Sequence, residues 1–191
     1  GFMLHDRDFV VLSDDWNGLP TSAIHLFRRL GRHNRVFWFN LLTRLPRPGL
    51  ADARKVVRAV GNWCRPARRS PATESGNVTV VSPLMIPWFR GPVRRFNAAS
   101  ISRTYRRLQR RHAIRDPIVV TTFPCAADVV REVESPCKLY YCVDDFPAYP
   151  GIDTATWTEM ESEWLASCDA LAVVSHELAR TRRVLGPTLH L

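Results

Sequence analysis

The chain has 191 residues, of which 46% are hydrophobic and 24% charged, so it can form one sizeable core and has the composition of a globular protein. No apolar run approaches the roughly 20 residues that span a bilayer, and residues 1–8 lack the apolar segment of a signal peptide. The five cysteines are odd in number and form no CxxC pair, which argues against a disulfide framework and against a structural zinc site, and makes a reducing cytoplasm the simplest compartment.

The first elements of the chain predict a strand–helix–strand unit. Residues Asp8–Ser13 form an apolar, β-branched run that is typical of a buried strand. Thr21 or Ser22 can then cap a helix that stops at Gly31. A second strand follows at Arg35–Asn40, and this length is that of a parallel pair joined by a helix.

The same alternation continues to the end of the chain. Helices are expected over residues 52–63, 93–112, 126–133, 154–167 and 177–185, a polar loop over 66–76, and strands over 77–82, 117–122, 138–143, 170–175 and 188–191. Near-continuous apolar strands separated by helices predict a Rossmann-like α/β fold, with a parallel sheet of about six or seven strands and helices on both faces. The chain reads as one domain over 1–191, and its last strand, cut short as it begins, indicates a domain taken from a longer protein.

The turn after the first strand is the first candidate site, because ligands of open parallel sheets gather at the C-terminal ends of the strands. We expect Asp15, Trp16, Asn17 and Gly18 to contact a substrate, with Gly18 allowing close approach of the backbone and the following helix favouring an anionic group. The turn lacks the GxGxxG pattern of dinucleotide-binding loops. An ordinary connecting loop is therefore an equally good interpretation.

Two adjacent carboxylates, Asp144 and Asp145, end the fifth expected strand. Adjacent residues on an extended chain point opposite ways, so one can face a ligand as a general base while the other braces the loop. The alternative is that both only cap turns. His176, after the sixth expected strand, can contact a ligand or simply begin the next helix. Glu161 lies on or next to the core face of the helix expected over 154–167, and a carboxylate at the border of a core needs a hydrogen-bonding or charged partner.

The net charge of the whole chain is +9, and its basic residues are concentrated in the first part of the sequence. Residues 1–116 carry 22 of the 27 Lys and Arg but only 7 of the 18 Asp and Glu. Within 93–112, an apolar stripe of Ile101, Tyr105, Leu108 and His112 lies opposite an arginine stripe. We expect an anionic membrane surface to be contacted by Trp88, Phe89, Arg94, Arg95, Arg103, Arg106, Arg107 and Arg110. A solvated basic face is an equally good interpretation, and nucleic-acid binding ranks third because no recognition motif is present.

Three stretches carry a resemblance to a known family: Val10–Trp16, Tyr140–Phe146 and Glu161–Leu178. Together they resemble the N-terminal domain of family-4-like bacterial glycosyltransferases of the GT-B fold, which build surface polysaccharides. The resemblance implies two Rossmann-like domains, with an acceptor-binding N-terminal domain and a donor-binding C-terminal domain that this sequence does not include.

The resemblance also implies roles for individual residues. Either Asp144 or Asp145 is the expected catalytic base, and the loop around Trp16, Asn17 and Gly18 is expected to contact the acceptor or the donor phosphates.

The expected function follows from this resemblance. It is transfer of a sugar from a nucleotide-sugar donor to a saccharide or lipid-linked acceptor, with no cofactor beyond that donor and no metal. The expected place is the cytoplasm, peripherally on the inner face of the plasma membrane, and the chain alone is expected to be inactive. The alternative is a non-catalytic Rossmann-type module that binds a nucleotide or an anionic polymer.

Overall fold

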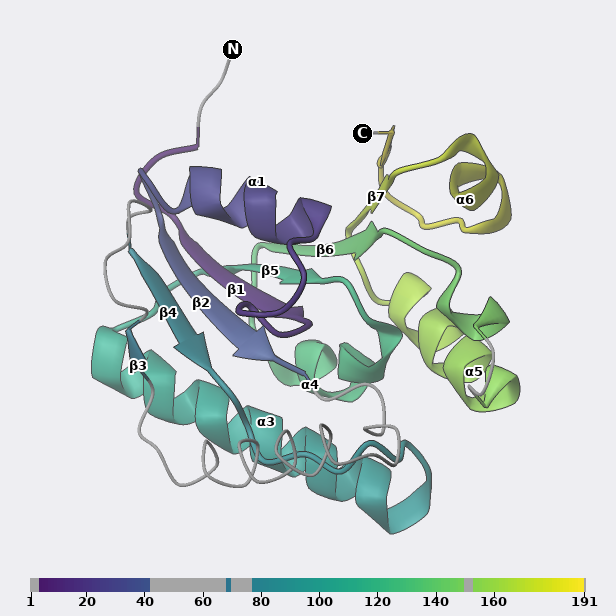
Figure 1. Ribbon diagram of the computed structural model, residues 1–191, viewed down its shortest axis with the longest axis horizontal. Helices are drawn as coiled ribbons and strands as arrows, with labels where there is room; N and C mark the ends of the chain where they lie inside the picture. The colour runs from purple at the N-terminus through teal and green to yellow at the C-terminus, as the bar shows by residue number, and fades with distance from the viewer. Residues whose placement is uncertain (1–3, 42–67, 70–76, 150–152, 191) are drawn as a thin grey trace.

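The computed structural model describes residues 4–41, 68–69, 77–149 and 153–190, and it shows an α/β fold built on one sheet. The order of the strands in the sheet is β3-β4-β2-β1-β5-β6-β7-β8 (Figure 1). The strands are β1 (Asp8–Ser13), β2 (Arg35–Asn40), β3 (Arg68–Arg69), β4 (Val78–Val81), β5 (Ile118–Thr121), β6 (Cys137–Cys142), β7 (Ala170–Val173) and β8 (Thr188–His190).

Seven of these strands are parallel, as the sequence predicted. Only β3 differs: it pairs antiparallel with β4, where the sequence predicted a polar loop. The two-residue β3 takes up the free edge of β4. The helix expected over 52–63 lies outside the described residues.

Helices cover both faces of the sheet. They are α1 (Ser22–Leu30), α3 (Gly91–His112), α4 (Ala127–Glu132), α5 (Thr154–Leu165) and α6 (His176–Thr181), with short 3-10 turns η1 (Pro124–Ala126) and η2 (Phe146–Ala148). α1 covers one face, and α3, α4 and α5 cover the other (Figure 1). None of these described helices is long and apolar enough to cross a bilayer.

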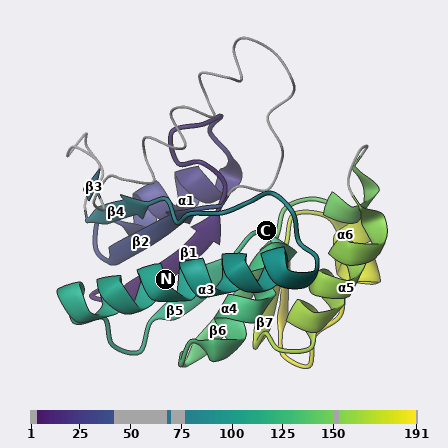
Figure 2. The ribbon, with the colours of Figure 1, turned by 90° about the horizontal axis from the view of Figure 1, so that it is seen from below.

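The alternation of side chains along β1 explains the two layers. Phe9 and Val11 pack into the cluster that contains α1, whereas Val10 and Leu12 pack into the cluster that contains α3. Successive side chains of a strand point to opposite faces, so an all-apolar strand must be covered on both sides. Figure 2 looks at the second face and shows α3 lying across the sheet with α4 beside it.

The direction of the crossovers changes at β1. From β1 the chain moves outward through β2 to β4, then returns to place β5 on the other side of β1. The connections that follow β1 and β5 therefore leave in opposite directions. In open parallel sheets this is the topological switch point, outside which ligands bind at the C-terminal ends of the strands.

Candidate functional site

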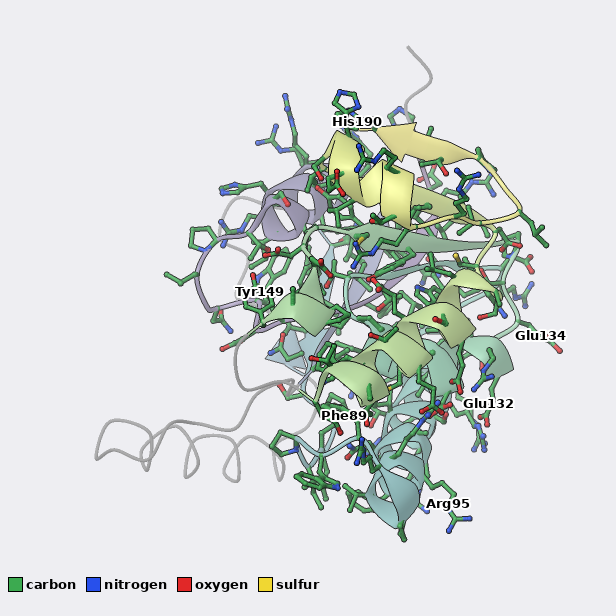
Figure 3. All side chains as sticks on the ribbon, turned by 90° about the vertical axis from the view of Figure 1, so that its right-hand side faces the viewer. Phe89, Arg95, Glu132, Glu134, Tyr149 and His190 are labelled. Atoms are coloured by element: carbon green, nitrogen blue, oxygen red, sulfur yellow. The ribbon has the colours of Figure 1, made fainter. Side chains whose placement is uncertain are left out.

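The parallel strands bring the loops that follow β1, β5 and β6 to one edge of the sheet, which we call the C-terminal edge. The predicted substrate-contacting loop and the predicted catalytic aspartates both leave from it. Figure 3 shows Tyr149, which follows β6, on one side of the molecule and Glu134, which precedes β6, on the opposite side. The shared edge that the sequence analysis requires is therefore present.

Three polar side chains meet at the switch point, and we call them the switch-point cluster: Ser13, Asp14 and Thr122. The Ser13 and Thr122 hydroxyl oxygens are 2.7 Å apart and both side chains are buried. Ser13 Oγ also donates to Asp14 Oδ1 at 3.1 Å. Because a hydroxyl has one proton to give, Thr122 must donate to Ser13 while Ser13 donates to Asp14. The cluster is thus a directed chain of hydrogen bonds that ends on a carboxylate.

Asp14 is the residue of this edge that the sequence analysis did not select. Its side chain is half-buried, and this burial raises the pKa of the Asp14 carboxyl, while the hydrogen bond from Ser13 opposes the rise. The Trp38 indole N–H donates to the Asp14 backbone carbonyl at 2.9 Å and fixes the start of the loop. The available signal was its position, directly after the central strand at which the crossovers reverse.

The rest of the first loop is a tight turn. Asp15 Oδ1 accepts from the backbone N–H of Asn17 at 3.1 Å and from the side-chain amide of Asn40 at 3.2 Å. A Cβ at Gly18 would lie 3.0 Å from the Asp15 carbonyl, so glycine lets the turn close. Asp15, Asn17 and Gly18 are exposed and can meet a ligand.

Trp16 requires a correction to the predicted set. Its side chain is 5% exposed and packs edge-to-face on Trp38, with ring centroids 4.9 Å apart. The ring therefore belongs to the core beneath α1 and offers no surface to a substrate. The sequence does not distinguish these two roles, because an aromatic residue in a loop can pack into the core as readily as it can contact a substrate.

The two predicted catalytic aspartates have different surroundings. Asp144 is exposed, accepts a hydrogen bond from the Tyr149 hydroxyl, and accepts the Asp145 backbone N–H at 2.9 Å. Asp145 instead binds the Arg182 guanidinium at 2.5 Å. An arginine keeps its proton, so the Asp145 oxygen that it holds is not free to accept one from a substrate. Both carboxylates are exposed, but the charge of Asp145 is paired with Arg182, whereas the two groups that hold Asp144 are neutral donors. Asp144 therefore keeps its negative charge for a ligand, and we favour it over Asp145 on that ground.

Arg182 anchors a buried ionic network behind this loop. Its side chain is 9% exposed and its Nε and terminal nitrogen each lie 3.3 Å from an oxygen of Glu161, whose side chain is 8% exposed. The Tyr140 hydroxyl donates to the same carboxylate at 2.8 Å. Glu161 thus has the partners that its place on the core face required, and the network ties α5 to β6 and to the residue after α6.

His176 lies farther along the same edge. It is the first residue of α6, and its ring stacks on that of His190 with centroids 4.1 Å apart (His190 is labelled in Figure 3). β7 is three strand positions from β1, which corresponds to roughly 14 Å. His176 therefore does not join the switch-point cluster.

Two members of the predicted membrane-contacting set also need correction. Phe89 is 7% exposed and packs edge-to-face on Trp157, so it is a core residue. Arg94 is held by Asp128 at 2.7 Å and by Glu163, and these acids neutralise its charge. The remaining members of the set are exposed: Trp88, Arg95, Arg103, Arg106, Arg107 and Arg110.

Among the described residues, no group of three or more His, Cys, Asp or Glu side chains is placed to hold a metal ion. No protein-family model matches the chain, and no curated protein matches it. The geometry of the C-terminal edge is therefore what bears on function.

Proposed function

We propose that the chain is the acceptor-side domain of a glycosyltransferase, which moves a sugar from a nucleotide-sugar donor to a hydroxyl of a saccharide or lipid-linked acceptor in the synthesis of cell-surface polysaccharide. The observation that supports this most is the partly buried Asp14 carboxylate at the switch point, at the end of the hydrogen-bond chain through Ser13 and Thr122. Two stretches that resemble the family, Val10–Trp16 and Tyr140–Phe146, end at the same edge.

In this proposal Asp14 is the general base. The acceptor hydroxyl oxygen attacks the anomeric carbon and its proton passes to Asp14, while the bond between the anomeric carbon and the diphosphate breaks and the diphosphate leaves with the electron pair. A carboxylate whose pKa is raised by burial is a stronger base than a hydrated one. Ser13 donates to one oxygen of Asp14 and leaves the other to receive the proton.

Asp144 has the complementary role of binding acceptor hydroxyls. The strands β1 and β6 are separated by β5, so the ends from which Asp14 and Asp144 leave are two strand spacings, roughly 10 Å, apart. The Tyr149 hydroxyl orients the Asp144 side chain. The donor would be bound mainly by a second domain, whose charges would stabilise the leaving diphosphate.

The second candidate function is a non-catalytic module that binds an anionic polymer. The exposed arginines of α3 favour it, because they belong neither to the switch-point cluster nor to the loop after β6 and take no part in the transfer scheme. Turnover separates the two candidates, since a module binds without transferring sugar.

The test is transfer by the full product of the gene, supplied with a panel of nucleotide sugars and saccharide or lipid-linked acceptors, with products followed by mass spectrometry. We expect Asp14→Asn to lower kcat about 10²–10⁴-fold and Asp144→Asn to raise the KM for the acceptor. The matched control is Asp116→Asn, an exposed aspartate just before β5 at the opposite edge, which should leave both constants unchanged. Wild-type kcat in a correctly folded Asp14→Asn protein would refute the assignment of the base.

A further inference from the structure

An open groove of about 1190 Å³ is lined by residues of α3 and α4, on the face of the sheet that α3 covers. Seven arginines of α3 line it: Arg94, Arg95, Arg103, Arg106, Arg107, Arg110 and Arg111. The α4 side contributes Asp128, Arg131 and Glu132. Figure 3 shows Arg95 on α3 and Glu132 on the side of α4. The groove has no residue in common with the C-terminal edge described above.

The two acidic side chains of the groove, Asp128 and Glu132, already have partners within the protein. Asp128 binds Arg94 and Arg131, each at 2.7 Å. Glu132 accepts from Ser102 at 3.3 Å and lies 3.7 Å from Arg106. They therefore cannot neutralise the remaining arginines of α3.

Among the described residues, five guanidinium groups of α3 consequently have no counter-charge. Within the part of the chain that the structure describes, no ion pair is made by Arg95, Arg103, Arg107, Arg110 or Arg111. Like charges this close repel one another, so an anionic ligand would relieve an existing cost as well as add contacts. Guanidinium groups also form bidentate hydrogen bonds with phosphate oxygens.

The spacing of these charges fits an elongated ligand. Arg95 and Arg111 are 16 residues apart on one helix, which corresponds to about 24 Å along its axis. Arg103, Arg107 and Arg110 follow one another at helical spacings of four and three, so they form a continuous strip. A single phosphate can engage only part of this row, whereas a chain of phosphates can engage all of it.

A membrane is a poorer match for the same surface. A helix that lies in a bilayer interface immerses its apolar face, but the apolar stripe of α3 is buried against the sheet through Ile101, Tyr105 and Leu108. The exposed aromatic residues Trp88 and Phe96 lie only before and near the start of α3.

A nucleic acid fits less well too. Single-stranded nucleic acids are held by aromatic side chains that stack on the bases, together with basic residues. The groove lining contains Arg, Ala, Ser, Asp and Glu but no aromatic residue. We infer that the α3–α4 groove binds a linear polymer of phosphate groups that carries no bases, through the five unpaired arginines. This binding is independent of the proposed transferase activity.

The experiment measures binding of fluorescein-labelled long-chain inorganic polyphosphate by fluorescence anisotropy at several salt concentrations. Each neutralised phosphate of a flexible strand contributes about −0.7 to the slope of log affinity against log salt, so five contacts predict a slope of about −3.5. The variant Arg103/Arg107/Arg110→Gln should bind at least about 10-fold more weakly and flatten the slope by about 2.

The matched control removes three charges elsewhere. Arg7, Arg29 and Arg32 are exposed and lie before β1 or at the end of α1, outside the groove, so Arg7/Arg29/Arg32→Gln should keep the wild-type slope. All six positions are exposed, and thermal melts of both variants should match the wild type. Equal affinity of the two triple variants would overturn the inference. So would an affinity for single-stranded DNA of matched charge equal to that for polyphosphate, or binding to phosphatidylglycerol vesicles without binding to polyphosphate.

Discussion

Replacement of Arg182 by methionine tests how the loop after β6 is held. The variant keeps much of the side-chain volume but removes the cation that faces both oxygens of Glu161 at 3.3 Å. Glu161 would then remain buried, with the Tyr140 hydroxyl as its partner, whereas Asp145 is 53% exposed and can return to water. The main cost is therefore the uncompensated charge of Glu161.

Removal of one partner of a buried ion pair costs about 3–5 kcal/mol of unfolding free energy. For a domain of this size each kcal/mol lowers the melting temperature by roughly 2–4 °C, so Arg182→Met should melt roughly 6–20 °C below the wild type. The control Arg180→Met removes a cation that is 77% exposed and paired with Glu177, and should change the free energy by less than about 0.5 kcal/mol.

The decisive variant is the double substitution Arg182→Met/Glu161→Gln. A neutral glutamine still accepts the Tyr140 hydrogen bond but carries no charge, so the double variant should be more stable than Arg182→Met by about 0.5–3 kcal/mol. Urea denaturation followed by tryptophan fluorescence gives the four free energies of the cycle. A double variant no more stable than Arg182→Met would refute the view that the buried Glu161 charge causes the loss.

The contacts of Asp14, of two buried cysteines and of Thr21 can each be tested by a substitution or a labelling experiment. Burial raises the pKa of the Asp14 carboxyl in the folded state, so the contribution of Asp14 to stability is lost as pH rises through that pKa. Asp14→Asn should therefore be more stabilising at pH 7.5 than at pH 4.5. Equal changes in the free energy of unfolding, measured by urea titration at the two pH values, would contradict this. Burial raises the pKa of the Cys125 thiol to about 12 and that of the Cys142 thiol to about 11. Both thiols should therefore resist alkylation by iodoacetamide at pH 8 until urea unfolds the chain, as measured by mass spectrometry. Rapid labelling of the native protein would contradict this prediction. Thr21 accepts the Ile24 backbone N–H at 3.4 Å as the cap of α1, so Thr21→Ala should cost about 1 kcal/mol in thermal or urea unfolding, and Thr21→Ser should restore it.

The strands and the layers could be predicted because their signals are local. The strands expected at Asp8–Ser13 and Arg35–Asn40 have the observed bounds, and α1 begins after Thr21 and ends before Gly31 as expected. A fully apolar run can be stable only when both of its faces are covered, so these runs already require a sheet between two layers of helices. That requirement is a property of the residues themselves and holds before any long-range contact is known.

The partners of individual side chains were decided only by the tertiary structure. The sequence marks Trp16, Asp145 and Arg94 as polar or aromatic residues in favourable places, but Trp38, Arg182 and Asp128, which pack on or bind them, are 22 to 37 residues away along the chain. The switch-point cluster arises in the same way, because Ser13 and Thr122 meet only when β5 is inserted beside β1. Secondary structure follows from the periodicity of neighbouring residues, whereas burial and charge pairing depend on the order in which the strands assemble.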